Sequence, residues 1–587
     1  MRVLFFSFII IVLLQGCFDE QTGYLRTCGD RIVNARGENV VLMGSGLGGW
    51  MLQEGYMLQT AGFAGTQHEI KNIIADLIGD EGMDLFYEAW LANYCTRQDI
   101  DSLAAWGFNS IRLPMHYNLF TLPIEEEPVK GQDTWLESGF VMVDSLLQWC
   151  AKNEMYLILD LHAAPGGQGK NADISDYDSD KPSLWESEEN RRKTIALWQK
   201  IAERYAHEPW IGGFDLINEP NWDFENSDNE NGCNCQKNVP LWALYKDIID
   251  AIRKIDKNHI VFIEGNCWGN NYKGLPDVNE WDDNLVLSFH KYWNFNDQAS
   301  IQNLVDMREE LNVPVWVGET GENSNTWFAN AIELLASNNI GWAWWPYKKI
   351  ESPTGSVTAP KTEGYQTLLN YWRGVGDKPD HKQAVNWLMA QADMLKLENC
   401  TINYDVLDAM FRHPTGDRSP MPFKKHIVPG RVFAVDYDLG GNTQAWFDTD
   451  TANYRSSIKA NIPWNKGKVY RNDGVDIAPC KDVISNSHCV GWTEPDEWLL
   501  YTINVEVSGL YNILIRYSAE NDLGELLFHV NENYQTGVGF LPATGGVDIW
   551  NTFIINNVDL QAGKNTIKLT FKKGGLNINY MEFQSRI

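Results

Sequence analysis

Eight short apolar segments alternate with longer helical patterns between residues 40 and 345, and this alternation constrains the fold more than any other feature. The stretches between the segments, such as residues 190–205, place apolar side chains at a period of about 3.6 residues. Repeated βα units of this kind form a parallel sheet, and eight of them close into a (β/α)8 barrel. The predicted strands are 40–43, 110–113, 156–161, 213–217, 259–264, 285–288, 313–317 and 341–345.

Polar and aromatic side chains of catalytic type lie at the ends of most of these predicted strands. In a (β/α)8 barrel the C-terminal strand ends form the active site. A single glutamate after a strand is usually a solvated loop residue, but coincidence is a poor explanation for a whole set. The candidates are Arg112, His162, Asn218, Glu219, His290, Tyr292, Glu319 and Trp345.

Glu219 and Glu319 form the most informative pair. The fourth and seventh strands of such a barrel lie across its mouth, so we expect the two carboxylates to face one substrate bond. Glycoside hydrolysis needs two carboxylates, one to protonate the leaving oxygen and one to attack or activate water at the anomeric carbon. This chemistry needs no cofactor. We also expect no metal, because Cys233-Asn234-Cys235 is too tight for a zinc pair and lacks neighbouring ligands.

Charge and aromatic content indicate the kind of partner. The chain has 78 acidic and 48 basic side chains, a formal charge of -30, so nucleic acid and anionic membrane surfaces are poor partners. Most of the 25 tryptophans and 23 tyrosines are expected in the core, but their flat faces also suit stacking on sugar rings. The composition therefore favours a neutral or cationic ligand, and the carboxylate pair favours a polysaccharide.

The N-terminus carries a predicted export signal. Residues 3–14 form an apolar run that is too short to span a bilayer but typical of a signal peptide. The run ends in Leu14-Gln15-Gly16-Cys17, which resembles the lipobox of bacterial lipoproteins and implies a lipid on Cys17. We expect a signal peptide over 1–16, a tether over 17–32, and a bacterial outer membrane lipoprotein that faces the periplasm or the cell surface. The N-terminal lipid would be its only membrane contact.

Two motifs resemble those of a known enzyme family. Leu216-Ile217-Asn218-Glu219-Pro220 and Val317-Gly318-Glu319-Thr320-Gly321 look like the acid/base and nucleophile motifs of glycoside hydrolase family 5, and the resemblance covers about residues 33–373. It implies a retaining enzyme with Glu219 as acid/base and Glu319 as nucleophile. The remaining strand-end candidates match the positions of the family's other site residues.

The resemblance also implies roles for those neighbours. Asn218 would hydrogen-bond the sugar 2-hydroxyl. Arg112 and Tyr292 would hold Glu319 ionised, His162 and His290 would orient hydroxyls and carboxylates, and Trp345 would form the floor of the reacting subsite. Residues 44–50 and 160–168 look most like the exo-1,3-β-glucanase branch of the family. Insertions at 170–189 and 221–238 leave strand ends, so we expect them to wall the cleft.

A second module follows the barrel. We expect the catalytic domain with a C-terminal helical extension over 33–413, a Pro-rich linker over 414–429, and a β-sandwich over 430–587. Val428-Pro429-Gly430-Arg431, Val490-Gly491-Trp492-Thr493 and Leu576-Asn577-Ile578-Asn579-Tyr580 resemble carbohydrate-binding module family 6. The resemblance implies that Trp492 and Trp550 sandwich a sugar ring and that Asn577 hydrogen-bonds it. The alternative is that both tryptophans are core residues.

The module departs from its family at one site. Phe433 and Val435 stand where the family usually has two glutamates that help bind a structural calcium, and neither side chain can ligate a hard cation. Structural calcium is therefore in doubt.

The sequence thus predicts a retaining hydrolase of β-1,3- or β-1,4-glucan with a sugar-binding module. Two alternatives stay open: hydrolysis of another β-glycan, such as mannan or xyloglucan, and a non-catalytic glycan-binding surface protein that keeps the barrel as a scaffold. The intact Glu219 and Glu319 argue against the second. Endo or exo action does not follow from the sequence.

Overall fold

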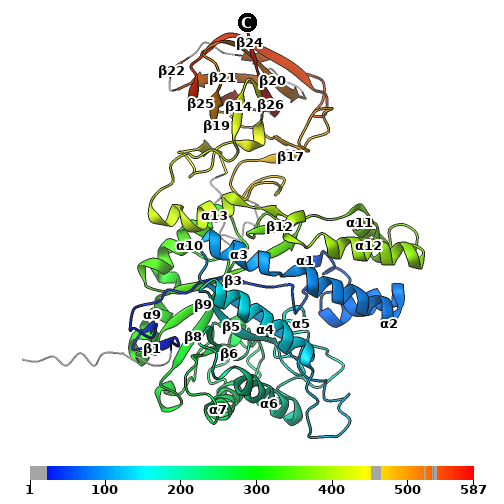
Figure 1. Ribbon diagram of the computed structural model, residues 1–587, viewed down its shortest axis with the longest axis vertical. Helices are drawn as coiled ribbons and strands as arrows, with labels where there is room; N and C mark the ends of the chain where they lie inside the picture. The colour runs from blue at the N-terminus through cyan, green and yellow to red at the C-terminus, as the bar shows by residue number, and fades with distance from the viewer. Residues whose placement is uncertain (1–22, 451–463, 521–523, 532, 535–538, 587) are drawn as a thin grey trace, which may run out of the picture.

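A computed structural model describes residues 23–586, apart from 451–463, 521–523, 532 and 535–538. The chain forms two bodies stacked along its longest axis, an α/β barrel and an antiparallel β-sandwich (Figure 1). This arrangement confirms the predicted fold class. In the described part of the chain, no helix combines the length and the apolarity needed to cross a membrane.

Eight parallel strands close the barrel, and each pairs with its neighbours in chain order until the last meets the first. Their residues are almost all buried, which is typical of parallel strands covered by helices on the outside. The strands are β3 (Met43–Gly46), β4 (Ser110–His116), β5 (Tyr156–Ala163), β6 (Ile211–Asp215), β7 (Val261–Glu264), β8 (Leu285–Lys291), β9 (Val315–Gly321) and β10 (Gly341–Trp345).

The long helices of this part of the chain surround the barrel, and each buries one apolar stripe. In α6 that stripe contains Leu197, Trp198 and Ile201, and the Ser187 hydroxyl caps the first turn by accepting from the Asn190 N–H. These helices are α2 (Gln67–Tyr94), α3 (Arg97–Trp106), α4 (Glu137–Lys152), α6 (Glu188–Tyr205), α7 (Val239–Arg253), α9 (Gln302–Leu311) and α10 (Asn325–Ser337). Short helices α1 (Gly55–Leu58), α5 (Ala172–Ser175) and α8 (Asn266–Gly269) lie in the loops.

The first barrel strand lies later than predicted, because it starts at Met43 instead of ending there. A Cβ atom on Gly44 would lie 2.9 Å from the Ser110 hydroxyl, and one on Gly46 would lie 2.9 Å from the Trp345 ring. The neighbouring strands therefore leave no room for side chains. A strand that must be glycine-rich lacks the β-branched pattern by which strands are predicted.

The predicted tether over 17–32 is structured in the part that is described. Strands β1 (Arg26–Cys28) and β2 (Arg31–Val33) form an antiparallel hairpin. Leu25 and Ile32 are buried in an apolar cluster with residues from the N-terminal ends of the barrel strands. The compact domain therefore begins before residue 33.

The helical extension packs on the barrel, where α12 (His381–Asp393) contacts α2. It contains α11 (Glu363–Trp372), α12, α13 (Tyr404–Phe411) and a small sheet of β11 (Lys348–Ile350), β12 (Val357–Ala359) and β13 (Thr401–Ile402). The buried Lys348 ammonium joins it to the barrel, since it donates to Asp99 at 2.8 Å and to the Leu395 carbonyl at 2.6 Å.

Two mostly antiparallel sheets form the sandwich, with a core of alternating apolar side chains between them, and only β14 (His426–Val428) pairs in parallel, with β19 (Trp498–Val505), among the described strands. One sheet contains β14, β16 (Trp446–Phe447), β19, β21 (Gly524–Val530), β22 (Asn533–Tyr534), β23 (Gly539–Leu541) and β25 (Gly563–Lys573). The other contains β15 (Gly430–Phe433), β17 (Ile477–Pro479), β18 (His488–Val490), β20 (Gly509–Ala519), β24 (Asn551–Leu560) and β26 (Leu576–Ser585). Strand β14 lies within the predicted linker 414–429, so the end of that linker belongs to the sandwich.

Candidate active site

The C-terminal strand ends surround a cleft of about 600 Å³. Six predicted site residues line it: His162, Glu219, His290, Tyr292, Glu319 and Trp345. Arg112 and Asn218 lie behind this wall and are fully buried. The strand ends thus bring all eight barrel candidates together, as the alternation of strands and helices predicted.

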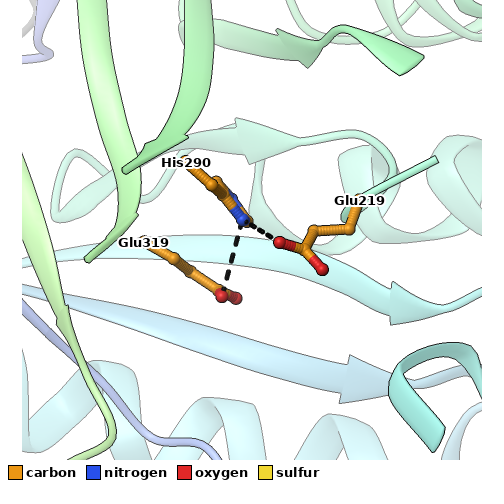
Figure 2. Close-up of side chains that lie close together, drawn as sticks. All are labelled: Glu219, His290 and Glu319. Atoms are coloured by element: carbon orange, nitrogen blue, oxygen red, sulfur yellow. Dashed lines mark hydrogen bonds and ion pairs between the residues drawn. The ribbon is translucent and has the colours of Figure 1, made fainter. Parts of the chain in front are cut away.

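Glu219 and Glu319 face each other across His290 (Figure 2). The His290 Nδ1 atom lies 2.6 Å from Glu219 Oε1 and 3.5 Å from Glu319 Oε2. One oxygen of each carboxylate lies within 4.8 Å of the other. Burial lowers the pKa of His290, but the carboxylates of Glu264, Glu319 and Glu219 outweigh burial and raise it well above its ordinary value. His290 is therefore a cation between two carboxylates.

Arg112 and Tyr292 bind the Glu319 carboxylate, as expected. Arg112 Nη1 donates to Oε1 at 2.6 Å, and the Tyr292 hydroxyl donates to Oε2 at 3.1 Å. Burial raises the pKa of Glu319 above its ordinary value, and the positive charges of His290 and Arg112 oppose that rise. The carboxylate is thus held in one orientation by two donors on opposite oxygens.

His162 and Trp345 form one stacked unit. Their rings are 5.1 Å apart and nearly parallel, with an angle of 6°. Burial lowers the pKa of His162 to about 4, so the ring is neutral near pH 7. Its Nδ1 donates to Asp160 at 2.8 Å, and Trp345 Nε1 donates to the Tyr56 hydroxyl at 2.9 Å. These bonds fix the indole face that the sequence predicted as the subsite floor.

Asn218 contacts two other residues of the site. It does not line the cleft, and its side chain is fully buried. Its amide oxygen accepts from Arg112 Nη2 at 2.9 Å, and its amide nitrogen contacts His162 Nε2 at 3.2 Å. Here the side chain orients those two residues, and direct contact with a sugar 2-hydroxyl stays a prediction.

Two buried glutamates were missed by the sequence reasoning. Glu264 ends β7, and its carboxylate accepts the Glu219 backbone N–H at 2.7 Å and Arg112 Nη2 at 3.1 Å. It holds the Glu219 backbone in a left-handed conformation, with φ of 41°. Glu54 lines the cleft, and burial, with Glu319 next in effect, raises its pKa well above the ordinary value. Glu264 could have been found, because it stands at the end of a predicted strand. Glu54 follows the first strand, whose position was predicted wrongly, so its place at a strand end could not be recognised.

The two insertions contribute to the cleft in different ways. Asn171, Asp173 and Ile174, from the insertion at 170–189, line it directly, as predicted. No residue of 221–238 lines this cleft. Instead a disulfide joins Cys233 to Cys267 and so braces the loop that carries Trp268, another lining residue.

The three active-site residues of Figure 2 also have the spacing of metal ligands. Glu219, His290 and Glu319 are the only such group in the described residues, with ligand atoms within 4.8 Å of one another. In this arrangement they bind each other, and Arg112 supplies a permanent positive charge. The absence of a metal and of a cofactor stays a prediction.

In the sandwich, the segments that carry Trp492 and Trp550 both approach Asn577. Trp492 is 45% exposed and belongs to neither apolar core, which excludes the core alternative for this residue. Asn577 donates to the Val547 carbonyl at 3.4 Å, and a Cβ on Gly491 would lie 3.1 Å from its amide oxygen. Trp550 is half-buried in the loop that contains Val547. Their binding role stays a prediction.

Apolar side chains occupy the two positions of the family's calcium-binding glutamates. Val435 is fully buried in the sandwich core, and Phe433 packs against the same core. Neither side chain offers a ligand atom for calcium, and the absence of a structural calcium stays a prediction.

Comparison with known proteins adds independent information. Residues 71–350 match the model of Cellulase (glycosyl hydrolase family 5), and residues 468–585 match that of Carbohydrate binding module (family 6). A beta-xylosidase from Phanerodontia chrysosporium is 28% identical over 381 residues, which cover 59% of this chain and 75% of that protein.

Two further relatives have different names. Endoglucanase C from Acetivibrio thermocellus is 25% identical over 330 residues, 46% of this chain and 88% of that protein. A probable glucan 1,3-beta-glucosidase A from Aspergillus niger is 25% identical over 267 residues, 44% of this chain and 56% of that protein. The protein is therefore a glycoside hydrolase, in which residues 71–350 match the family 5 cellulases and residues 468–585 match the family 6 carbohydrate-binding modules.

Proposed function

We propose that the protein hydrolyses a β-glucan by double displacement, with Glu319 as nucleophile and Glu219 as acid/base. The observation that carries the proposal is the pair of carboxylates with oxygens within 4.8 Å across His290. Carboxyl groups about 5 to 5.5 Å apart suit retention, whereas inverting enzymes keep them about 6.5 to 9.5 Å apart to admit a water. The short separation supports attack by Glu319 itself.

Each step assigns a proton and a bond to a side chain present in the cleft. Glu319 attacks the anomeric carbon while Glu219 protonates the departing glycosidic oxygen, and a glycosyl ester on Glu319 forms. Glu219 then removes a proton from water, which attacks the same carbon and releases Glu319. Arg112 and Tyr292 stabilise the Glu319 carboxylate as it becomes the leaving group.

The substrate assignment rests on the cleft and on the relatives together. Aromatic faces and hydroxyl-binding carboxylates line the cleft, which suits a neutral sugar chain. The relatives named endoglucanase and glucan 1,3-beta-glucosidase support a β-glucan. The relative named beta-xylosidase matches the largest part of the chain among the three, and it favours a xylose-containing β-glycan as the second candidate.

We also propose a lipid anchor at Cys17. This residue lies outside the described residues, so the support is the lipobox-like Leu14-Gln15-Gly16-Cys17 alone. A lipid on the mature N-terminus would place the enzyme on the bacterial outer membrane. The structured domain begins within ten residues of Cys17, with Tyr24 and Leu25.

Removal of the catalytic carboxylates tests the assignment of roles. Glu319→Ala should abolish hydrolysis, and Glu219→Ala should nearly do so but spare activated aryl β-glycosides, whose leaving groups need little protonation. Azide should restore turnover of Glu319→Ala with inverted product, because a small anion fits the vacated space. NMR of the first-formed anomer is the decisive measurement, and inversion by the wild-type enzyme would overturn the mechanism.

The pH dependence tests which carboxylate limits activity in acid. Glu319 must be ionised to attack, and burial raises its pKa, so kcat/KM should fall below a pH that lies above the ordinary carboxyl value of 4.5. In Glu219→Gln, assayed on an activated aryl glycoside, the acid limb should stay in place, because Glu219 is protonated and uncharged when it acts as the acid. A shift of the acid limb in this variant would assign that limb to Glu219 instead of Glu319.

The exposure of Trp492 allows binding to be separated from stability. Trp492→Ala should weaken retention on insoluble glucan by about 2- to 10-fold, the value of one aromatic stacking contact. It should shift the melting temperature by no more than about 2 °C, because the ring is exposed. The matched variant Trp446→Ala removes a ring that is 2% exposed and should lower the melting temperature instead. Equal effects of the two variants on stability would make Trp492 a structural residue.

Fractionation tests the anchor. Cys17→Ser should release the protein from the membrane fraction without a change in kcat/KM on soluble oligosaccharide, because lipid attachment needs the thiol. Retention of the variant in membranes would show that the apolar run over 3–14 is an uncleaved anchor.

A further inference from the structure

The sandwich is joined to the barrel through the buried side chain of Asn472. This residue is fully buried, and its amide nitrogen donates to the Asn323 carbonyl at 2.8 Å and to Asn325 Oδ1 at 3.0 Å. Its backbone N–H donates to Asp405 at 2.7 Å, and its carbonyl accepts the Asn325 N–H at 3.0 Å. A buried residue whose amide nitrogen, backbone N–H and backbone carbonyl are all paired across the contact fixes the relative position of the two bodies.

The barrel segment that Asn472 contacts belongs to the edge of the cleft. Asn323 follows Glu319 by four residues and lies two residues after the end of β9. Glu322, between them, lines the cleft, and its carboxylate accepts from Lys349 at 2.7 Å. The hydrogen bonds of Asn472 therefore hold the loop that leads from the proposed nucleophile to the cleft edge.

A second contact joins the sandwich to another residue that lines the cleft. Trp464 packs against Trp293 with ring centroids 6.3 Å apart, and Trp464 is only 6% exposed. Trp293 lines the cleft directly after Tyr292, the residue that binds Glu319. Although Trp293 belongs to the barrel, it packs against the apolar core of the sandwich. The sandwich therefore supports Trp293, a tryptophan that lines the cleft.

The backbone of Trp293 shows that it needs such support. Its φ is 56°, a left-handed conformation that is unfavourable for a bulky side chain and persists only where surrounding contacts impose it. Trp464 supplies one of those contacts, and it stands eight residues before Asn472 in a single segment of the sandwich. That segment also touches the sugar-binding face, since a Cβ on Gly467 would lie 3.6 Å from the Trp492 ring.

We propose that segment 464–472 of the carbohydrate-binding module completes the catalytic cleft. Trp464 and Asn472 are positioning residues: they hold Trp293 and Glu322 as a wall that binds sugar units of the glycan next to the reacting one. The ring of Trp293 provides the stacking face, and Glu322 provides a carboxylate that accepts from sugar hydroxyls. The inference rests on the proposed function, because it assigns this wall to the same glycan substrate.

A double-mutant cycle on a soluble oligosaccharide tests the proposal. Trp464→Ala should raise KM about 3- to 10-fold, the range expected for one stacked ring, with kcat within about 2-fold of wild type. Trp293→Ala should have a similar effect, and the double variant should be no worse than Trp293→Ala alone, because Trp464 acts through Trp293. Trp464→Phe should recover most of the affinity.

Two further variants separate positioning from general destabilisation. Trp498→Ala is the matched control, since Trp498 is a half-buried tryptophan of the same module that packs under Lys568 and not against the cleft. It should leave KM unchanged. Asn472→Ala removes the second support and should raise KM as Trp464→Ala does, so the proposal stays testable if either variant folds poorly.

The outcomes distinguish this inference from the proposed function. The positioning role would be overturned if Trp464→Ala and Trp293→Ala had additive effects on KM. It would also be overturned if kcat fell by as large a factor as KM rose, or if the change in KM were no larger than that of Trp498→Ala. If the wild-type enzyme cleaves no β-glycan, the proposed function fails by itself. The same cycle is then measured as oligosaccharide affinity by calorimetry in the Glu319→Gln background, where hydrolysis plays no part.

Discussion

The buried guanidinium of Arg112 is the interaction on which the rest of the active site depends. It contacts carboxylates from β5, β6, β7 and β9, at 3.3 Å from Asp160, 2.9 Å from Asp215, 3.1 Å from Glu264 and 2.6 Å from Glu319. Acidic groups at this depth pay a large desolvation penalty, which raises the pKa of Asp160 to about 7 and that of Asp215 well above the ordinary value. The attraction to Arg112 opposes both rises. A permanent cation at this point stabilises the anionic form of Glu319, which is almost fully buried at the base of the cleft.

The same network explains why two buried histidines hold opposite charge states. His290 lies 3.1 Å from Glu264 as well as beside the catalytic pair, and the carboxylates raise its pKa. His162 is equally buried, and burial lowers its pKa, because the positive charges of Arg112 and His290 offset the opposing carboxylates of Glu319 and Glu219. One ring therefore supplies charge between the carboxylates, while the other is a neutral support for Trp345. Position in the charge network, and not residue type, decides the role.

The sequence was sufficient for the barrel and for the carboxylate pair, because both are written in local patterns. Strand–helix alternation gives the order of the elements, and strand order places Glu219 and Glu319 across the mouth. The first strand was misplaced because packing against Trp345 demands glycine, which removes the local signal. Contacts such as Asn472 with Asn323, or Trp464 with Trp293, join segments about 150 to 170 residues apart. The sequence around Asn472 and Trp464 contains no pattern that would reveal which residues they contact.

The docking of the module has a consequence for how specificity is built. A binding module on a free tether raises only the local concentration of substrate, and its own affinity is independent of the cleft. Here Asn472 is fully buried and Trp464 packs against a residue that lines the cleft. The module is therefore in direct contact with the cleft wall. Strand β17, next to the Trp492 site, lies at the end of the sandwich that faces the barrel (Figure 1). Changes in the module that fit it to a different glycan would therefore also alter the wall beside the catalytic pair, and the two specificities are expected to change together.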